Sequence, residues 1–208
     1  LAATVGRVGV ISGRPISFLA GLLPDGVALS GLYGLETLVD GEREDHEQSG
    51  NWREVVADLG AHATAAGPDG MRVETKELSI TLHYRERPEL ADDVQVWAAE
   101  EAARSGLQAR PARRSWELHP PIDVDKGSAV VRLAGDASAV CFIGDDHGDL
   151  PAFAALEALA AQGRATLKVA VDSVEASAEL LDRADLVVEG PEAVEALLEE
   201  LDRLVHPG

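Results

Sequence analysis

The order of apolar and polar positions divides the chain into two kinds of segment. Short apolar runs at 5–11 and 27–32 predict buried strands, and the segment 16–23 between them predicts a short helix. After Pro121, strands are predicted at 139–144, 167–171 and 186–188, and helices at 126–133, 150–162, 174–181 and 191–204. Alternating strands and helices of this kind predict an α/β core whose parallel sheet is covered on both faces.

The middle of the chain follows a different pattern. Helical spacing of apolar residues predicts helices at 52–66 and 88–105, while 71–85 and 116–119 predict strands. Along the strand at 79–84, Ile80, Leu82 and Tyr84 share one face and polar residues share the other. We therefore expect a small α+β unit with one polar sheet face, inserted at 35–119 into a core made of 1–34 and 120–208.

Charge and composition narrow the classes of partner. The formal net charge of −19 opposes binding to nucleic acid or to anionic lipid, so any phosphate site must be locally positive. No apolar run is long enough to span a membrane, and no signal peptide is recognisable. The single Cys141 fits a reducing compartment. We expect no nucleic-acid partner, no membrane partner and a cytoplasmic location.

Three carboxylates follow the apolar strand at 139–144. Asp145, Asp146 and Asp149 lie within five residues, directly after Gly144. Ligands bind beyond the C-terminal ends of parallel strands, and a hard cation such as Mg²⁺ removes the repulsion between packed carboxylates. The alternative is that Asp149 caps the helix that begins near Leu150, which explains one acid but not the two that precede it.

Two further positions suit a phosphate. Ser12, Gly13 and Arg14 form a strand-to-helix turn whose hydroxyl and backbone N–H groups suit a phosphate oxygen, although such turns are also ordinary turn chemistry. Lys126 begins a predicted helix, where a cation is unfavourable unless a negative ligand offsets the helix dipole; the alternative is a solvated surface lysine.

The order of these motifs resembles the second, third and fourth motifs of the haloacid dehalogenase superfamily, and more narrowly the trehalose-6-phosphate phosphatase family. The matching stretches are Val10–Pro15, Gly31–Gly34 with Glu36, Val73–Lys76, Leu82–Arg85, Glu117–Pro120, Asp125–Gly127 and Gly144–Phe153. The resemblance implies a haloacid-dehalogenase-like Rossmannoid core with an inserted α+β cap domain. It implies hydrolysis of a small-molecule sugar phosphate, trehalose 6-phosphate, through an aspartyl-phosphate with Mg²⁺ as cofactor.

The resemblance also implies roles for individual residues. Ser12 would hold a phosphate oxygen, with Gly13 and Arg14 beside it, and Lys126 would bind the transferring phosphoryl group. Asp145 and Asp146 would ligate Mg²⁺, and Asp149 would orient Lys126 and the metal shell. In the cap, Glu74, Lys76 and Glu117 would bind sugar hydroxyls; from the residues alone they equally suit a solvated sheet face.

One motif of the family is not found. The family carries Asp-x-Asp near its N-terminus, which supplies the attacking carboxylate, whereas no Asp precedes Asp25 here. The resemblance places the strand that carries this motif mid-sheet, between the strands that end at Ser12 and at Asp145. We therefore expect a fragment of a longer enzyme, inactive by itself, whose missing N-terminal segment completes the core. The alternatives are a phosphatase for another sugar phosphate, such as sucrose phosphate or mannosyl-phosphoglycerate, and a phosphatase-like domain that binds a partner without turnover.

Overall fold

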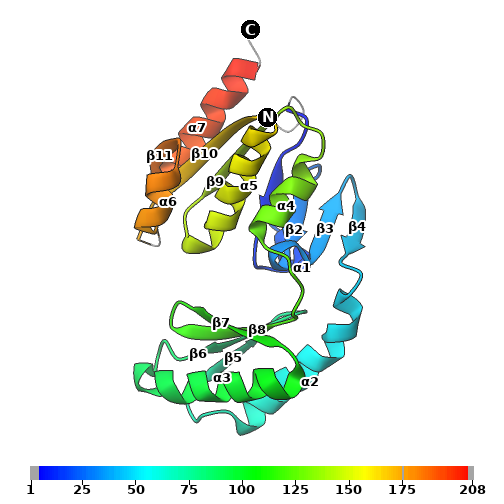
Figure 1. Cartoon of the computed structure of the whole chain (residues 1–208), viewed down its shortest axis with the longest axis vertical. Helices are drawn as coiled ribbons and strands as arrows, with labels where there is room; N and C mark the ends of the chain where they lie inside the picture. The colour runs from blue at the N-terminus through cyan, green and yellow to red at the C-terminus, as the bar shows by residue number, and fades with distance from the viewer. Residues whose placement is uncertain (1–4, 175, 206–208) are drawn as a thin grey trace. The chain divides into compact units, whose positions relative to one another are not determined.

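The computed structural model describes residues 5–174 and 176–205, which form two compact units (Figure 1). The second unit is Asp45–Asp123, and the first unit is the chain on either side of it. These boundaries differ from the expected insertion at 35–119. The difference arises because the strands β3 (Glu36–Val39) and β4 (Glu42–Asp45) extend the sheet of the first unit.

The first unit contains two sheets. One has the order β1-β2-β3-β4, in which β1 (Gly9–Ile11) pairs parallel with β2 (Ala28–Gly31) and β2 pairs antiparallel with β3. The other has the order β11-β10-β9 and is parallel throughout. Its strands are β9 (Ala139–Gly144), β10 (Ala165–Asp172) and β11 (Leu186–Glu189). The parallel pairing confirms the α/β core predicted from the sequence.

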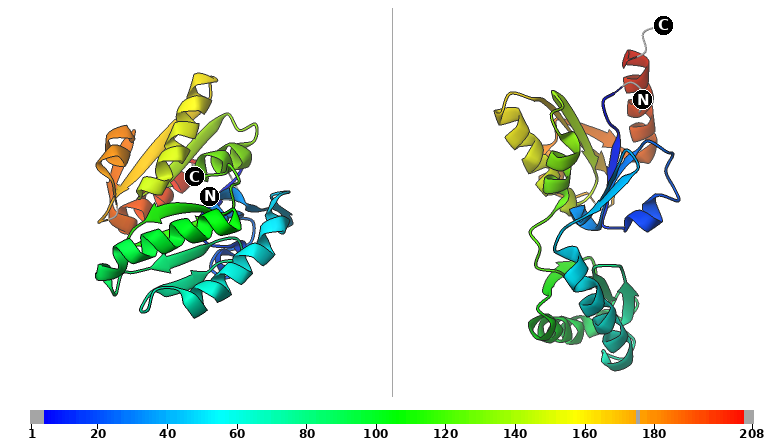
Figure 2. Two further views of the ribbon diagram at one scale, coloured as in Figure 1. Left: turned by 60° about the horizontal axis from the view of Figure 1, so that its bottom comes forward. Right: turned by 90° about the vertical axis from the view of Figure 1, so that its right-hand side faces the viewer.

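Helices cover both faces of these sheets (Figure 2, right). They are α1 (Ile16–Leu19), α4 (Lys126–Ala134), α5 (Leu150–Ala161), α6 (Ala178–Arg183) and α7 (Gly190–Val205). On the α5 side, the ring of Phe153 is fully buried and meets the ring of Phe142 edge-on, with 6.3 Å between centroids. The helices α4 and α5 lie on one face, while α1 and α7 lie on the other.

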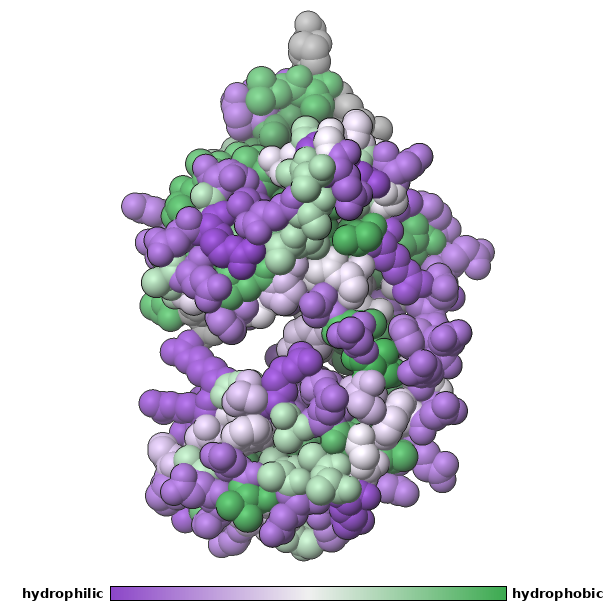
Figure 3. Space-filling view, viewed as in Figure 1, coloured by the Kyte–Doolittle hydropathy of each residue, from purple (hydrophilic) through white to green (hydrophobic). Residues whose placement is uncertain are grey.

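Four strands of the first unit, β1, β4, β9 and β11, each have one neighbour among the described residues, and β1 and β9 are the two that concern the site. β1 pairs with β2, and β9 pairs with β10, so one edge of each strand is open there. The apolar strand β9 exposes Ala139 and Cys141. Apolar side chains also remain exposed on α7 (Figure 3), and Leu204 of this helix is 67% exposed. Open strand edges of this kind leave backbone hydrogen-bonding groups without a sheet partner.

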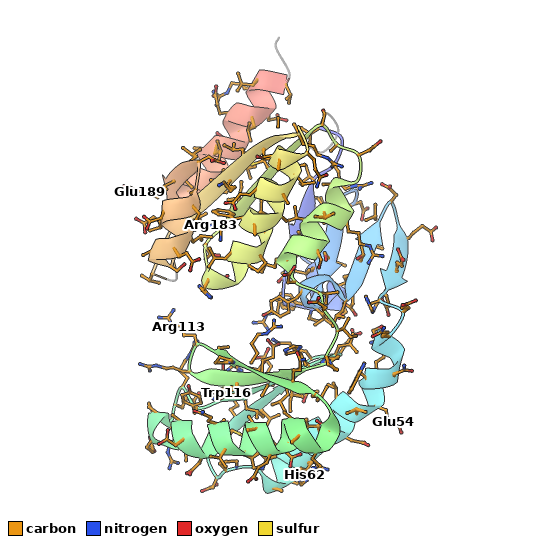
Figure 4. All side chains as sticks on the ribbon, viewed as in Figure 1. Glu54, His62, Arg113, Trp116, Arg183 and Glu189 are labelled. Atoms are coloured by element: carbon orange, nitrogen blue, oxygen red, sulfur yellow. The ribbon has the colours of Figure 1, made fainter. Side chains whose placement is uncertain are left out.

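The second unit is a four-stranded antiparallel sheet with two helices on one face. The strands are β5 (Arg72–Thr75), β6 (Ile80–His83), β7 (Gln108–Ala112) and β8 (Ser115–His119), in the order β5-β6-β8-β7. The helices α2 (Arg53–Ala66) and α3 (Ala91–Ser105) pack on the apolar face, where Ile80, Leu82 and Leu118 are fully buried. Trp116, labelled in Figure 4, also packs against this core. The opposite face is polar, as the alternation along β6 predicts.

Hydrophilic side chains dominate the visible surface of each unit (Figure 3), in keeping with the net charge of −19. Within 5–174 and 176–205, no helix has both the length and the apolar character needed to span a membrane.

Candidate functional site

The hydroxyl of Ser12 lies in a turn at the C-terminal end of β1. The backbone N–H of Ser12 donates to Ser30 O (2.9 Å), and Ser12 O accepts from the N–H of Tyr33 (3.1 Å). The Ser12 Oγ accepts from the N–H of Arg14 at 3.1 Å. Because that oxygen is the acceptor, the hydroxyl proton of Ser12 is available to donate to a ligand such as a phosphate oxygen.

Close packing against Tyr33 explains why the turn contains Gly13. A Cβ at position 13 would lie 2.5 Å from the Cζ of Tyr33. Tyr33 itself adopts φ 59°, a left-handed conformation within the 3₁₀ turn η1 (Leu32–Gly34). The next residue, Arg14, is exposed and places its guanidinium 5.4 Å from the centroid of the Phe18 ring. The conformation of the turn therefore depends on packing against Tyr33 of η1 as well as on the residues of the turn.

The acidic loop after β9 folds back on itself around Asp149. Asp149 is only 3% exposed, and its Oδ2 accepts from the N–H groups of Asp145 (2.9 Å) and Asp146 (3.2 Å). A Cβ at Gly144 would lie 2.6 Å from the Asp149 Cγ, so glycine is required at the strand end. Asp149 does occupy the N-cap position of α5, as the alternative expected, but its carboxylate makes no capping hydrogen bond to that helix and accepts from the loop instead.

Lys126 reaches this loop from the first turn of α4. Its Nζ lies 2.5 Å from Asp149 Oδ1 and 3.7 Å from Asp146 Oδ1, and its side chain is 12% exposed. Asp125 caps the helix by accepting from the N–H of Ser128 at 2.8 Å. A Cβ at Gly127 would lie 2.4 Å from Pro151 O, so glycine lets α4 approach α5 closely. Lys126 is therefore not a solvated surface lysine.

The carboxylates of Asp145 and Asp146 fit a hard cation. Asp146 Oδ1 is buried and has no hydrogen-bond partner in the described structure, while Asp145 beside it is exposed. Over the described ranges, no group of three or more His, Cys, Asp or Glu side chains is arranged to hold a metal. Two adjacent carboxylates still suit Mg²⁺, which usually keeps several waters and takes further oxygens from a substrate phosphate.

Comparison of the chain with models of known protein families identifies its family. The model of the trehalose-phosphatase family matches residues 1–185. The chain belongs to the trehalose-phosphatase family. The family is one of phosphatases, and the Ser12 turn, Lys126 and the acidic loop are the candidate site residues of this trehalose-phosphatase family member.

Solved structures agree with the family on the fold. A trehalose-6-phosphate phosphatase related protein is 20% identical with a TM-score of 0.73, covering 98% of this chain and 83% of its own. The C-terminal domain of trehalose-6-phosphate phosphatase from C. albicans is 22% identical with a TM-score of 0.68, covering 96% and 77%. A haloacid dehalogenase-like hydrolase from Bacteroides thetaiotaomicron is 15% identical with a TM-score of 0.69, covering 96% and 88%. Curated protein sequences gave no match.

In this trehalose-phosphatase family member, the polar face of the second unit collects three predicted residues. The predicted residues are Glu74, Lys76 and Glu117. Strand register places Glu74 opposite Thr81, and Thr81 opposite Glu117, so Glu74 and Glu117 lie on the same face of the sheet. Lys76 Nζ lies 3.1 Å from Glu117 Oε1, which also accepts from Ser79 Oγ at 2.9 Å. Glu117 is 6% exposed, so it is not a freely solvated surface residue.

Glu74 has a different neighbour on the same face. His83 Nε2 lies 2.9 Å from Glu74 Oε2. The structure therefore pairs Lys76 directly with Glu117, while Glu74 lies across β6 from them and pairs with His83. Thr81 stands between the two pairs, with an Oγ1 that is buried and has no hydrogen-bond partner in the described structure.

Sequence reasoning missed the local role of one buried acid, Glu36. It is fully buried, and its Oε2 accepts from the N–H of Ile16 at 2.8 Å. The available signal was weak: a single acid between Leu35 and the strand residues that follow it, next to a glycine-rich turn. An acid in such a place is normally exposed, and only the fold shows that it is enclosed.

Proposed function

We propose that the protein is a Mg²⁺-dependent phosphatase that hydrolyses trehalose 6-phosphate to trehalose and phosphate. The observation that carries this proposal is the contact of Lys126 with the buried carboxylate of Asp149, which also accepts from the backbone N–H groups of Asp145 and Asp146. One carboxylate holds the Lys126 cation next to a loop that could bind a metal. Such an arrangement can neutralise the negative charge of a phosphoryl group.

Different residues of the first unit would bind different parts of the phosphate group. The Ser12 hydroxyl, whose oxygen already accepts from the N–H of Arg14, would donate to a phosphate oxygen. Lys126 would offset the negative charge on the transferring group, and Asp149 would hold the Lys126 ammonium in place. Pre-placed donors and charges of this kind lower the barrier without having to reorganise during the reaction.

Asp145 and Asp146 would hold the Mg²⁺ ion. A bound Mg²⁺ supplies charge neutralisation and a fixed orientation for the phosphoryl oxygens. The buried Oδ1 of Asp146 supports this assignment: it lies 3.7 Å from Lys126 Nζ but has no hydrogen-bond partner in the described structure, so it can still accept a cation ligand bond.

The attacking carboxylate would come from a strand that is not among the described residues. β1 and β9 each present an open edge, and residues 1–208 contain no Asp before Asp25. We propose that a further parallel strand pairs with both edges and carries the attacking Asp.

The polar face of the second unit would bind the sugar. Glu74 and Glu117 supply carboxylate acceptors, and Lys76 supplies a donor. A sugar hydroxyl both donates and accepts, so it fits between an acceptor and a donor on one sheet face.

A substrate panel tests this function. The protein in the length that its gene encodes should be assayed with Mg²⁺ on trehalose 6-phosphate, sucrose phosphate, mannosyl-phosphoglycerate and p-nitrophenyl phosphate. We expect kcat/KM to be highest for trehalose 6-phosphate and to vanish with EDTA. A higher kcat/KM for another sugar phosphate would refute the proposed substrate. Binding of trehalose 6-phosphate without turnover would instead show a non-catalytic phosphatase-like domain.

A further inference from the structure

Glu36 is a fully buried carboxylate that the proposed reaction does not use. It lies at the start of β3, with 0% of its surface exposed. Its Oε2 accepts from the N–H of Ile16 at 2.8 Å, and its Oε1 accepts from the Nη2 of Arg43 at 2.7 Å. Burying a carboxylate is costly unless it is paired and hydrogen-bonded, so its position in the fold calls for a reason.

The contact with Ile16 places Glu36 at the exit of the Ser12 turn. Ile16 is the first residue of α1 and comes directly after Pro15, so its N–H marks the point where the turn ends. The entry and middle of the turn are held by backbone bonds: Ser12 N–H to Ser30 O (2.9 Å), Tyr33 N–H to Ser12 O (3.1 Å) and Leu32 N–H to Arg14 O (3.1 Å). Glu36 adds a charged side chain to these restraints at the exit.

Gly31 makes room for this contact. A Cβ at position 31 would lie 2.8 Å from the N of Ile16, 2.9 Å from Glu36 Oε2 and 3.0 Å from Arg14 O. A side chain at position 31 would therefore push apart the carboxylate, the Ile16 amide and the turn. The last residue of β2 is thus a glycine for a reason that concerns the Ser12 turn.

Arg43 balances the charge of Glu36 from the other side. It comes from β4, whose last residue, Asp45, is also the first residue of the second unit. The Arg43 side chain is 41% exposed, so it links the buried carboxylate to the surface. With its charge offset in this way, Glu36 can hold the Ile16 amide without placing an uncompensated anion in the core near a phosphate site.

We propose that Glu36 is a positioning residue that fixes the Ser12–Arg14 turn in the conformation that binds phosphate. This inference rests on the proposed phosphatase function. Glu36 does not touch the phosphate; it acts through the Ile16 amide and the turn. Its loss therefore weakens the binding of the phosphate group while leaving the binding of the sugar by the second unit unchanged.

Product inhibition tests the proposal on the protein in the length that its gene encodes. Inhibition constants for orthophosphate and for trehalose are measured separately, using any phosphate ester that the protein hydrolyses with Mg²⁺. In Glu36→Gln the near-isosteric amide has one oxygen for two donors, so the turn loses a restraint. We expect the inhibition constant for orthophosphate to rise about tenfold, as for a lost hydrogen bond to a charged group, while that for trehalose changes less than about twofold.

Thr37→Val is the matched control. Thr37 is the next residue of β3, is 4% exposed, and its Oγ1 has no hydrogen-bond partner in the described structure. It should leave both inhibition constants unchanged. If Glu36→Gln does not fold, Gly31→Ala disrupts the same contact with the charge of Glu36 intact, and should show the same selective loss for orthophosphate.

Three results would overturn the proposal. One is an unchanged orthophosphate constant in folded Glu36→Gln. Another is an equal weakening for orthophosphate and trehalose, which would indicate a merely structural role. The third is a wild-type protein that orthophosphate does not inhibit, which would also remove the proposed function. A wild-type protein that prefers another sugar phosphate refutes only the proposed substrate, because the orthophosphate comparison of wild type with Glu36→Gln remains valid and supports or rejects the role of Glu36.

Discussion

Lys126 Nζ lies 2.5 Å from Asp149 Oδ1, and the second oxygen of the same carboxylate accepts from the N–H groups of Asp145 and Asp146. One buried side chain therefore connects a cation on α4 to the backbone of the acidic loop after β9. Buried contacts to Asp149 hold both the Lys126 side chain and the backbone of the loop. The geometry makes Asp149 the residue whose removal disturbs both at once.

We predict that Asp149→Asn lowers kcat by about 100-fold and the free energy of unfolding by about 3 kcal/mol. The Asn amide cannot accept from Lys126 and from both loop N–H groups, so a buried cation loses its partner. Enzyme assays and urea unfolding measure the two effects. Glu157→Gln is the control. Glu157 forms an exposed pair with Arg183 (2.9 Å), whose side chain is labelled in Figure 4, and its loss should cost less than about 1 kcal/mol and leave kcat unchanged. Equal losses in the two variants would contradict a special role for Asp149.

The metal-binding assignment predicts a selective change in the response to Mg²⁺. Asp146→Asn removes the charge from the carboxylate whose buried Oδ1 has no hydrogen-bond partner in the described structure, so the Mg²⁺ concentration for half-maximal activity should rise about tenfold or more. Asp145→Asn should act in the same direction. High Mg²⁺ should restore part of the activity, as titration of each variant would show. Asp182→Asn, an exposed acid on α6, should match wild type. The assignment would fail if the Asp145 and Asp146 variants kept the wild-type Mg²⁺ response.

Close packing of α4 on α5 predicts that Gly127→Ala is destabilising, although alanine favours helices more than glycine does. The new Cβ would lie 2.4 Å from Pro151 O, which is backbone and cannot swing aside. We expect a loss of about 1–3 kcal/mol in the free energy of unfolding, together with lower activity because Lys126 is displaced. Gly6→Ala, where a Cβ meets nothing within 4 Å, is the control for urea unfolding. A stable Gly127→Ala variant would show that α4 can move away from α5 at little cost.

The positions of several strands could be predicted from the sequence, whereas contacts between side chains could not. Apolar runs mark β1, β9 and β10, because buried parallel strands lack polar alternation. The strand β4 escapes prediction because its sequence, Glu-Arg-Glu-Asp, has the charges typical of an exposed loop, and it lies at a sheet edge where charge is tolerated. β7 escapes for a related reason, since it contains Pro111 and is also an edge strand.

Contacts between distant residues do not follow from the spacing of residues alone, and the role of Asp149 in orienting Lys126 came only from the family resemblance. Lys126 and Asp149 are separated by 23 residues, and only the approach of α4 to α5 brings them together. The acids after β9 could be proposed from the sequence as a metal site, because their spacing is local, and this stays a prediction. The enclosure of Glu36 could not be predicted from its neighbours, because it depends on Gly31, Ile16 and Arg43 meeting around it in space.

His119 predicts a pH dependence for the stability of the second unit. Burial lowers its pKa, and the positive charge of Arg110 lowers it further. The folded state therefore disfavours protonation: stability is intact above the unfolded pKa of about 6.5 and falls as the pH drops below it. We expect His119→Gln to lose less thermal stability than wild type between about pH 7.5 and about pH 5. His62→Gln, at an exposed position on α2 (Figure 4), should keep the wild-type difference. Equal slopes for wild type and His119→Gln would contradict this prediction.

The sugar-binding role of the second unit predicts a split between KM and kcat. Glu117 is 6% exposed and accepts from Lys76 and Ser79, so its carboxylate is held ready to accept from a sugar hydroxyl. Glu117→Gln keeps the shape but weakens these charged hydrogen bonds. It should raise KM for trehalose 6-phosphate about tenfold or more, whereas KM for p-nitrophenyl phosphate, which has no sugar, should change less than about twofold. Glu54→Gln, an exposed acid on α2 (Figure 4), is the matched control and should leave both values unchanged. If Glu117→Gln raised KM equally for the two esters, the residue would act on the fold or on phosphate binding, and the polar face of the second unit would not be the sugar site.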